Sequence, residues 1–372
     1  MAPPTAPLVR FLDLARESIA LRSELHAALD RIIDSGVFLF GEEVEQLESE
    51  VARALQVGEG VGAASGTVAL QIMLLAHGIG PGDEVITTPA SFFATAKAIA
   101  QVGARPVFAD IDPDDYQLNP SRVQDCLSPR TRAILVVHLY GRPAPVLELR
   151  EIADRAGILL REDVAQAFGA TAHGRPIGSF GDSAALSFYP TKNLGAMGDA
   201  GMIVTKSAKV ADRCRSIRFL GYSGERDHFG PVGVSGRMDE VQAAFLRAKL
   251  GRVQQWNQDR QRLAARYDEL LPTELVRPGA RPEYQDVRHL YVVRCQQRDA
   301  LARWLMERGI ESQIHYRVPL HLQSLWHADQ ETLPVAESWA RTVLSLPLNP
   351  WLQQHEQDLV IEGVATFAER RI

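Results

Sequence analysis

Lysine is scarce in this sequence, and one lysine stands apart from the others by its surroundings. Only five of the 40 basic residues are lysine, and the other 35 are arginine, which stays charged and cannot act as an amine nucleophile. Lys192 lies in residues 187–201, where a strand-like segment runs into a proline turn and then into three glycines within seven residues. A lysine confined in such a turn is partly desolvated, so its pKa falls and its free amine becomes a usable nucleophile and base. The alternative is a surface lysine on a hairpin, which the glycine density disfavours.

The remaining lysines occur in arginine- or alanine-rich helical segments. They are Lys97, Lys206, Lys209 and Lys249. We expect all four to be solvated.

A carboxylate follows an apolar strand-like segment at residues 158–161. Asp163 should project at the carboxyl end of that strand. There it could pair with a protonated ring nitrogen and keep that ring cationic and electron-withdrawing. A second interpretation, that Asp163 caps a following helix, stays open on the residues alone.

Small residues at 64–67 precede an apolar helix that begins at Val68. Their size lets a ligand approach the backbone, the helix N-terminus favours an anion, and Thr67 adds a hydroxyl donor. The segment is neither a P-loop nor a GxGxxG fingerprint. Simple capping by Ser65 or Thr67 is the other interpretation, and the favoured one if the segment is taken alone.

An aromatic pair, Phe92 and Phe93, lies at a predicted strand-to-helix junction. Such a residue can stack on a planar ring or simply belong to the core. Taken together, the four segments offer an anion cradle, a carboxylate, a desolvated lysine and an aromatic side chain. These are the groups needed to hold pyridoxal phosphate.

These segments need a scaffold that brings them to one place. Strand-like segments are predicted at 84–87, 106–109, 133–138, 158–161, 184–188 and 202–205, and helices at 16–34, 42–56, 92–102, 146–156 and 206–219. This alternation predicts an α/β fold with a mostly parallel sheet flanked by helices. Ligands bind at the carboxyl ends of the strands in such sheets.

A long helical pattern at 238–271 is expected to bend or break at Gly251. It divides an N-terminal segment and large cofactor-binding domain, residues 1–251, from a small C-terminal α/β domain, residues 252–372. The second unit has a strand-like segment at 289–295 and helical patterns near 298–308, 334–344 and 354–370. No flexible linker is evident, so we expect the two units to pack tightly.

Composition excludes several classes of protein. Apolar residues make up 46% and charged residues 23%, which is typical of a folded globular chain. The net charge of −6 argues against a nucleic-acid binder or an anionic-membrane binder. No apolar run is long enough to span a bilayer, and the proline-rich start does not resemble a secretion signal. The three cysteines, Cys126, Cys214 and Cys295, form no metal or disulfide pattern, so we expect a cytoplasmic protein.

Residues 162–205 resemble the DegT/DnrJ/EryC1/StrS family of pyridoxal-phosphate sugar aminotransferases. Similar segments follow in the same order along most of the chain, including ASGTVAL (64–70), PGDEVITTPASFFATAKAI (81–99), SGRMDEVQAAFL (235–246) and IHYRVPLHLQ (314–323). The resemblance implies a fold type I aminotransferase, with a large domain built on a mostly parallel seven-stranded sheet and a smaller C-terminal domain. It also implies a homodimer whose active sites are shared between subunits.

Carried over position by position, the resemblance makes Lys192 the Schiff-base lysine and proton carrier. Asp163 would pair with the pyridine nitrogen, Gln166 would contact the ring hydroxyl, and Phe92 would stack on the ring. The cofactor phosphate would be held by Gly66, Thr67 and Ser187, and a substrate-facing loop would contain His315 and Tyr316.

The sequence departs from the family pattern at three positions. Ser235 stands where the family usually has an asparagine that reaches the partner subunit's cofactor phosphate, and a serine reaches less far. Arg317 replaces a common proline, and it could contact a diphosphate or a carboxylate of the substrate or simply face solvent. Ala200 replaces a common glycine, which is a small change.

The resemblance implies that an amino acid, L-glutamate, passes its amino group to a nucleotide-linked keto sugar at C3 or C4, with pyridoxamine phosphate as the intermediate form of the cofactor. A pyridoxamine-dependent sugar dehydratase would have a histidine in place of Lys192. An aminotransferase acting on a cyclitol or another ketone without a nucleotide remains an alternative. So does a non-catalytic regulator or partner subunit that binds the cofactor, which the presence of both Asp163 and Lys192 disfavours.

Overall fold

The computed structural model of the chain describes residues 8–225, 227–230, 232–326 and 332–370. Its central element is a seven-stranded sheet with the strand order β1-β9-β8-β5-β4-β2-β3. The seven strands are β1 Glu59–Ala63, β2 Glu84–Thr87, β3 Arg105–Phe108, β4 Thr131–Val137, β5 Leu159–Asp163, β8 Ser183–Ser187 and β9 Gly201–Thr205. Only β9 runs against the others, because it pairs antiparallel with both of its neighbours. The prediction of a mostly parallel sheet is confirmed.

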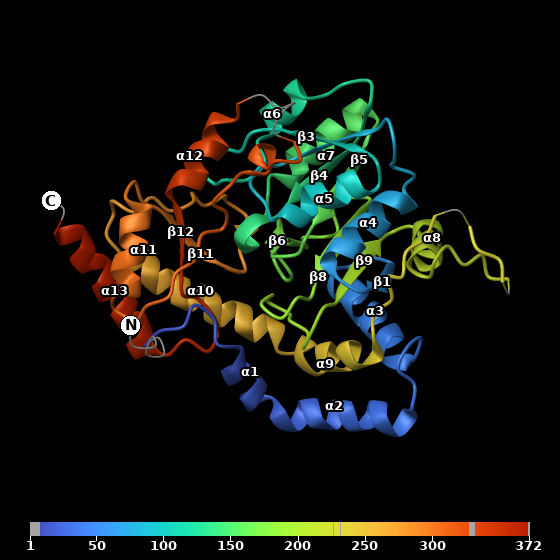
Figure 1. Cartoon of the computed structure of the whole chain (residues 1–372), viewed down its shortest axis with the longest axis horizontal. Coiled ribbons are helices and arrows are strands. Elements are labelled where there is room, and N and C mark those ends of the chain that lie inside the picture. The colour runs from blue at the N-terminus through green and yellow to red at the C-terminus, as the bar shows by residue number, and fades with distance from the viewer. Residues whose placement is uncertain (1–7, 226, 231, 327–331, 371–372) are drawn as a thin grey trace.

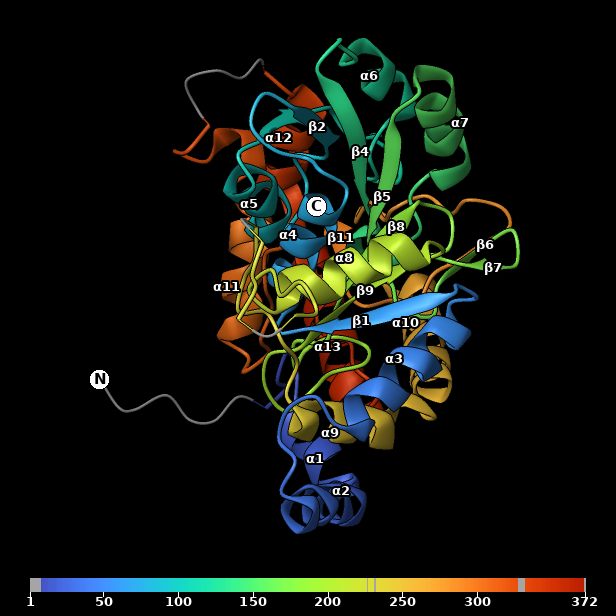
Figure 2. The same cartoon turned by 90° about the vertical axis from the view of Figure 1, so that its right-hand side faces the viewer.

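Helices cover both faces of this sheet. One face carries α3 Glu42–Ala54, α7 Val146–Ala156 and α9 Glu240–Leu250, and the other carries α4 Gly66–Ala76, α5 Phe93–Gln101 and α8 Ala208–Arg218. Figure 2 looks onto β1, with α8 on one side of it and α3 on the other. Side chains alternate along the strands: Ile134 and Val136 pack on the face that carries α3, α7 and α9, while Ala133 and Leu135 pack on the face that carries α4, α5 and α8.

The C-terminal part of the chain forms a second core beside the sheet. It contains the antiparallel pair β11 Tyr291–Arg294 and β12 Val343–Leu346, packed with α10 Val253–Leu270, α11 Arg298–Met306 and α13 Gln354–Glu369, while α12 Pro334–Thr342 leads into β12. Figure 1 shows these orange and red elements gathered on one side of the molecule. The start of α10 packs on the sheet core and its end on the second core, and Val9 bridges to Ile310. The domain boundary at 251/252 stays a prediction.

Smaller elements complete the fold. They are α1 Leu14–Ala20, α2 Arg22–Ser35, α6 Pro120–Asp125, the 3₁₀ turns Leu139–Gly141 and Leu320–Leu322, and a small sheet of β6 Thr171–Ala172, β7 Arg175–Pro176 and β10 Tyr284–Gln285. No helix in the described ranges is both long and apolar enough to cross a membrane. The expectation about a secretion signal falls largely on residues 1–7, which lie outside the described residues.

Most predicted elements are present, and the predicted break at Gly251 separates α9 from α10. Three details were wrong. The helix expected at 16–34 is two helices divided at Leu21, whose backbone angles, φ −104° and ψ 9°, leave the helical region. The helix expected at 334–344 ends at Thr342, because Val343 begins β12 and pairs with Arg294. Strand β1 was missed.

The missed strand β1 is rich in glycine, and its composition is typical of a loop. The structure explains the composition. A Cβ on Gly60 would lie 2.5 Å from the carbonyl oxygen of Glu48 on α3. Glycine is therefore needed for this helix to pack closely against the strand.

Candidate active site

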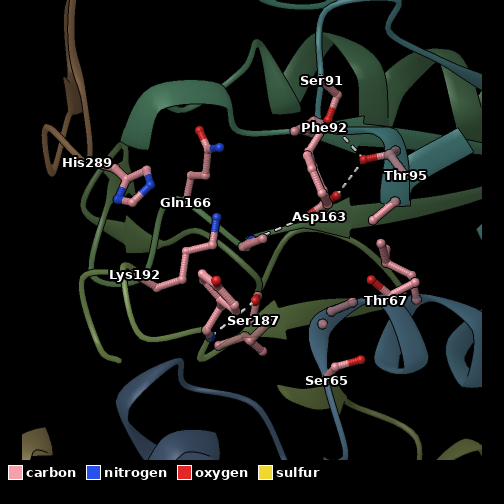
Figure 3. Close-up of a pocket in the computed structure, with 18 of the residues that line it drawn as sticks. Ser65, Thr67, Ser91, Phe92, Thr95, Asp163, Gln166, Ser187, Lys192 and His289 are labelled. Atoms are coloured by element: carbon pink, nitrogen blue, oxygen red, sulfur yellow. Dashed lines mark hydrogen bonds between the residues drawn. The ribbon is translucent and has the colours of Figure 1, made fainter. Parts of the chain in front are cut away.

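A cavity of about 470 Å³ opens at the carboxyl edge of the large sheet (Figure 3). β5 and β8 both end at this edge, and β9 begins there because it runs in the opposite direction. Nine of the predicted site residues line this cavity: Gly66, Thr67, Phe92, Asp163, Gln166, Ser187, Lys192, His315 and Tyr316. Residues from five separate parts of the sequence thus meet in one place.

Lys192 lies in a tight turn after β8. Its backbone amide donates to the carbonyl of Tyr189 at 2.8 Å, and the amide of Ala196 donates to Phe188 at 2.8 Å. A Cβ on Gly195 would collide with the carbonyl of Pro190, so this turn requires glycine. Burial lowers the pKa of Lys192 to about 8, although nearby Asp163 acts in the opposite direction. The lysine is therefore partly uncharged near neutral pH, as its surroundings in the sequence predict.

The expectation that the other four lysines are solvated is wrong for Lys249. This residue, on α9, is buried and forms an ion pair with Glu17 at 2.8 Å. Its Nζ also donates to the carbonyl of Gly195 at 2.8 Å. Lys249 thus supports the turn that carries Lys192, through contacts that are far away in sequence.

Asp163 ends β5 and is buried at the cavity wall. Thr95 donates its hydroxyl hydrogen to Oδ2 at 2.9 Å, and the amide of Ala165 donates to Oδ1 at 3.1 Å. Burial raises the pKa of Asp163, while these hydrogen bonds and the charge of Lys192 oppose the rise. The alternative interpretation, a helix cap, does not hold, because no helix begins directly after Asp163 in the structure.

The N-terminus of α4 lies against the end of β8. Ser65 caps the helix by accepting from the amide of Val68 at 3.2 Å, so the capping interpretation is correct for this residue. A Cβ on Gly66 would lie 2.5 Å from the Cβ of Ser187. The first turn of the helix and the hydroxyl groups of Thr67 and Ser187 therefore line one pole of the cavity. Backbone amides at the start of a helix have no acceptor within the helix, so this pole suits an anion.

The opposite wall is built from Gln166 and the loop at 315–316. Gln166 accepts from the amide of Tyr140 at 2.7 Å and donates to the Tyr316 hydroxyl at 3.2 Å. Phe92 is 57% exposed, and its ring centre lies 6.0 Å from that of Tyr316. His315 pairs with the hydroxyl of Ser345 at 2.9 Å, and burial lowers the pKa of His315 to about 4. Burial also raises the pKa of Tyr316.

Two predicted residues do not line the cavity. Ser235 is exposed, and its hydroxyl accepts from Arg237 at 3.4 Å. Arg317 is exposed and pairs with Asp299 at 3.4 Å. The role assigned to Ser235 requires a second subunit, so it stays a prediction, as does the substrate contact of Arg317.

The sequence reasoning missed two residues of the site. Thr95 was quoted within its motif, but its hydrogen bond to Asp163 was not foreseen. His289 lines the cavity although it belongs to the C-terminal part of the chain, directly before β11. The segment around it was recognised only as a strand, and nothing in its local pattern indicates a site.

The donor set fits pyridoxal phosphate. A helix N-terminus with two hydroxyl groups suits the phosphate, and the close packing of Gly66 leaves the backbone accessible there. Asp163 suits a protonated ring nitrogen, and Lys192 suits an aldehyde. Among the described residues, no group of three or more histidine, cysteine, aspartate or glutamate side chains is arranged to hold a metal ion.

Comparisons with known proteins agree with this description. A sequence model described as the DegT/DnrJ/EryC1/StrS aminotransferase family matches residues 20–365. The chain is 43% identical over 369 residues to a Streptomyces venezuelae protein named dTDP-3-amino-3,4,6-trideoxy-alpha-D-glucose transaminase, covering 98% of this chain and 97% of that one. It is 40% identical over 366 residues to a Geobacillus stearothermophilus protein named pleiotropic regulatory protein, covering 96% of this chain and 98% of that one.

A solved structure shares the same fold over nearly the whole chain. It is S. venezuelae DesV in complex with a ketimine intermediate, with a TM-score of 0.95 and 42% identity. The likeness covers 98% of this chain and 99% of that chain. The predicted fold type I architecture is confirmed.

Proposed function

The chain belongs to the DegT/DnrJ/EryC1/StrS aminotransferase family, and on that premise we propose that it moves an amino group from L-glutamate to the C3 ketone of a nucleotide-linked sugar. The observation that carries the proposal is the presence of Lys192 and Asp163 in one cavity, with an anion cradle at its far pole. The C3 position and the nucleotide follow the name of the S. venezuelae relative. Glutamate follows the family resemblance.

Each cavity residue has a role in this proposal. Pyridoxal phosphate, when bound, supplies the aldehyde and the electron-withdrawing ring. The first turn of α4, with Thr67 and Ser187, holds the phosphate. Asp163 keeps a proton at the ring nitrogen. Lys192 anchors the cofactor and, when its amine is free, takes a proton from substrate and returns it.

The remaining wall residues orient the two reactants. Phe92 would cover one face of the bound ring, and Gln166 would contact the ring hydroxyl. His315 and Tyr316 face the substrate. A hydrogen bond from the hydroxyl of Tyr140 to the carbonyl of His315 supports the position of this loop.

A homodimer with shared active sites is part of the proposal. Four consecutive apolar residues at 37–40 are exposed, as are Leu220, Phe229 and Val232. Single folded chains rarely leave so much apolar surface in contact with water. Ser235 lies in the same segment as the last three, so the proposal places it at the contact between the two subunits. Light scattering of the purified protein tests this proposal, and a monomer at micromolar concentration would contradict it.

The regulator interpretation is supported by the names of two relatives. The proposal favours catalysis, because a buried carboxylate that keeps the ring nitrogen protonated serves the reaction and is not needed for binding alone.

An absorption experiment separates the two functions. The wild-type protein loaded with pyridoxal phosphate should absorb in the violet, and L-glutamate should bleach this band. A protein that binds the cofactor but shows no change with glutamate would contradict the proposed reaction or its donor.

The acceptor needs a second experiment. Nucleotide-linked 3-keto and 4-keto sugars, together with a keto cyclitol, are offered with glutamate, and the products are read by mass spectrometry. Amination of the 3-keto sugar alone is the expected result. Preference for the 4-keto sugar or the cyclitol would reject the proposed acceptor while leaving the aminotransferase activity intact.

A further inference from the structure

Two buried amides form a chain of hydrogen bonds behind the Lys192 turn. Asn257 on α10 donates from Nδ2 to the carbonyl oxygen of Phe168 at 3.1 Å. Its Oδ1 is therefore free to accept, and Asn193 donates to it from Nδ2 at 2.7 Å. The same Nδ2 donates to the carbonyl oxygen of Val287 at 3.2 Å. Because carbonyl oxygens only accept, these contacts determine the orientation of both amides.

The orientation of Asn193 determines which nitrogen of His289 carries the hydrogen. Oδ1 of Asn193 lies 2.9 Å from Nδ1 of His289. Since this oxygen can only accept, Nδ1 must be the donor, and a neutral ring then has an unprotonated Nε2. Burial, with the positive charge of Lys192 acting in the same direction, holds the pKa of His289 well below its usual range. The ring is therefore neutral.

The backbone around His289 is held closely. The amide of Val287 donates to the carbonyl of Gly141 at 2.9 Å. Gly141 has φ +83°, and a Cβ there would lie 2.6 Å from the backbone nitrogen of His289. Any larger residue would push the histidine segment away. The imidazole is thus positioned both through its side chain and through its backbone.

The ring of His289 belongs to the cavity wall. His289 lines the cavity together with Lys192, and in the described part of the chain its Nε2 has no hydrogen-bond partner. Figure 3 shows the amine end of Lys192 directed to the side where His289 and Gln166 lie. Gln166 already bonds the amide of Tyr140 and the hydroxyl of Tyr316. Nε2 of His289 is an acceptor on that side of the cavity, while Asp163 and the imidazole of His315 also interact electrostatically with Lys192.

We propose that His289 is a positioning residue for Lys192, whose amine donates a hydrogen bond to the unprotonated Nε2 whenever that amine is free. The bond orients the amine of Lys192 toward the interior of the cavity. It also favours the ammonium form of Lys192, because a charged donor makes the stronger hydrogen bond. The contact is a property of this chain, and only its consequence for turnover depends on the proposed function.

The test measures the amine directly in the full-length, cofactor-free protein. Acetic anhydride labels unprotonated amines, so the extent of Lys192 acetylation against pH, read by mass spectrometry, gives the pH of half-labelling. Exposed Lys209 serves as the internal standard. In His289→Phe we expect the half-labelling pH of Lys192 to fall by about 0.5 to 1 unit. His289→Gln, which can offer an oxygen acceptor, should recover at least half of that shift.

The matched control is His77→Gln. His77 also has a pKa lowered by burial, but it pairs with Ser183 and does not line the cavity. Labelling of Lys192 should be unchanged in this control. In the glutamate reaction, His289→Phe should lower kcat by roughly ten-fold with little change in KM.

Several results would overturn the proposal. One is a folded His289→Phe protein whose Lys192 labels like wild type. Another is an unchanged labelling profile with a raised KM for the keto sugar, which would make His289 a substrate contact instead. If the phenylalanine variant does not fold, ¹⁵N NMR of the wild-type histidines decides, since a hydrogen on Nε2 of His289 contradicts the proposal. Failure of glutamate to react, with the labelling shift present, would reject the proposed function alone.

Discussion

Glu162 and Asp163 are neighbours on β5, but they lie on opposite faces of the sheet in opposite electrostatic surroundings. Glu162 is fully buried in the sheet core and accepts three backbone hydrogen bonds, from Gly178 at 2.8 Å, Phe180 at 2.9 Å and Gly181 at 2.6 Å. It also receives a hydrogen bond from Nε2 of His138 at 3.1 Å. Together these contacts hold the pKa of Glu162 below its usual range despite burial.

Asp163 has fewer donors and faces the cavity. Its two hydrogen bonds do not offset burial, so its pKa is raised. The same contrast separates Lys249, which is committed to Glu17 and Gly195, from Lys192, which lines the cavity. A buried charged group whose hydrogen-bond and ion-pair partners are all present stabilises the fold. A buried charged group that lines a cavity and has fewer such partners is available to a ligand.

Removal of the cavity lysine should have the largest effect on activity. Lys192→Ala should reduce transamination by at least about 10⁴-fold, because both the anchoring amine and the proton carrier are lost. Its thermal midpoint should stay near that of wild type, since no fold contact of the amine is removed. Single-turnover assays and calorimetry measure the two effects. Lys97→Ala, a lysine on α5 that does not line the cavity, is the control and should keep full activity.

The carboxylate of the cavity comes next. Asp163→Asn should lower kcat by about 10²- to 10³-fold, because the ring nitrogen loses its counter-charge. Its stability at neutral pH should equal or exceed that of wild type, since ionising the buried Asp163 costs free energy. Near-wild-type turnover in steady-state assays would refute the assigned role.

Replacement of Glu162, the carboxylate buried in the sheet core, should affect stability more than activity. Glu162→Gln places an amide N–H₂ among backbone donors and should reduce the free energy of unfolding by about 3 kcal/mol. Activity per folded molecule should stay within about ten-fold of wild type. Urea titration measures the first effect. An unchanged unfolding midpoint would show that the hydrogen bonds to Glu162 add little to stability.

The two carboxylates should also differ in the pH dependence of stability, which is the smallest of the expected effects. The lowered pKa of Glu162 contributes stability that is present above the unfolded value of about 4.3 and lost as pH falls through the folded value. The raised pKa of Asp163 has the opposite sign, because stability falls as pH rises through it. The stability difference between wild type and Glu162→Gln should therefore shrink in acid. The difference for Asp163→Asn, with reversed sign, should shrink too. Urea unfolding at pH 4 to 7 checks both, and a pH-independent difference for either variant contradicts the prediction.

Much of the fold could be predicted because its determinants are local. Short apolar runs separated by amphipathic helices indicate a parallel sheet, and β2 was predicted at residues 84–87, where the structure has it. β1 and the start of β12 could not be predicted in this way. Position 60 must be glycine because α3 packs closely against it. Val343 is a strand residue because it pairs with Arg294. Both reasons are contacts between segments far apart in sequence.

The site shows the same division. Motifs around Thr67, Asp163 and Lys192 could be found because each sits at the end of a recognisable strand or the start of a helix. His289 could not be found, because its position in the cavity depends on Asn193 and on the crossing of the segment at Gly141. Lys249 was misjudged for the same reason, since its partner Glu17 lies on α1.

By itself, the sequence determined which chemical groups are present and which strands carry them, because residue type and hydrophobic periodicity are local properties. Only the tertiary structure decided which carboxylate and which lysine remain open to a ligand. Glu162 and Asp163 differ by one position along β5, and the alternation of side chains across a strand sends one into the sheet core and the other into the cavity. Desolvation and the supply of hydrogen-bond partners depend on distant segments packed nearby, and those two quantities separate a structural charge from a reactive one.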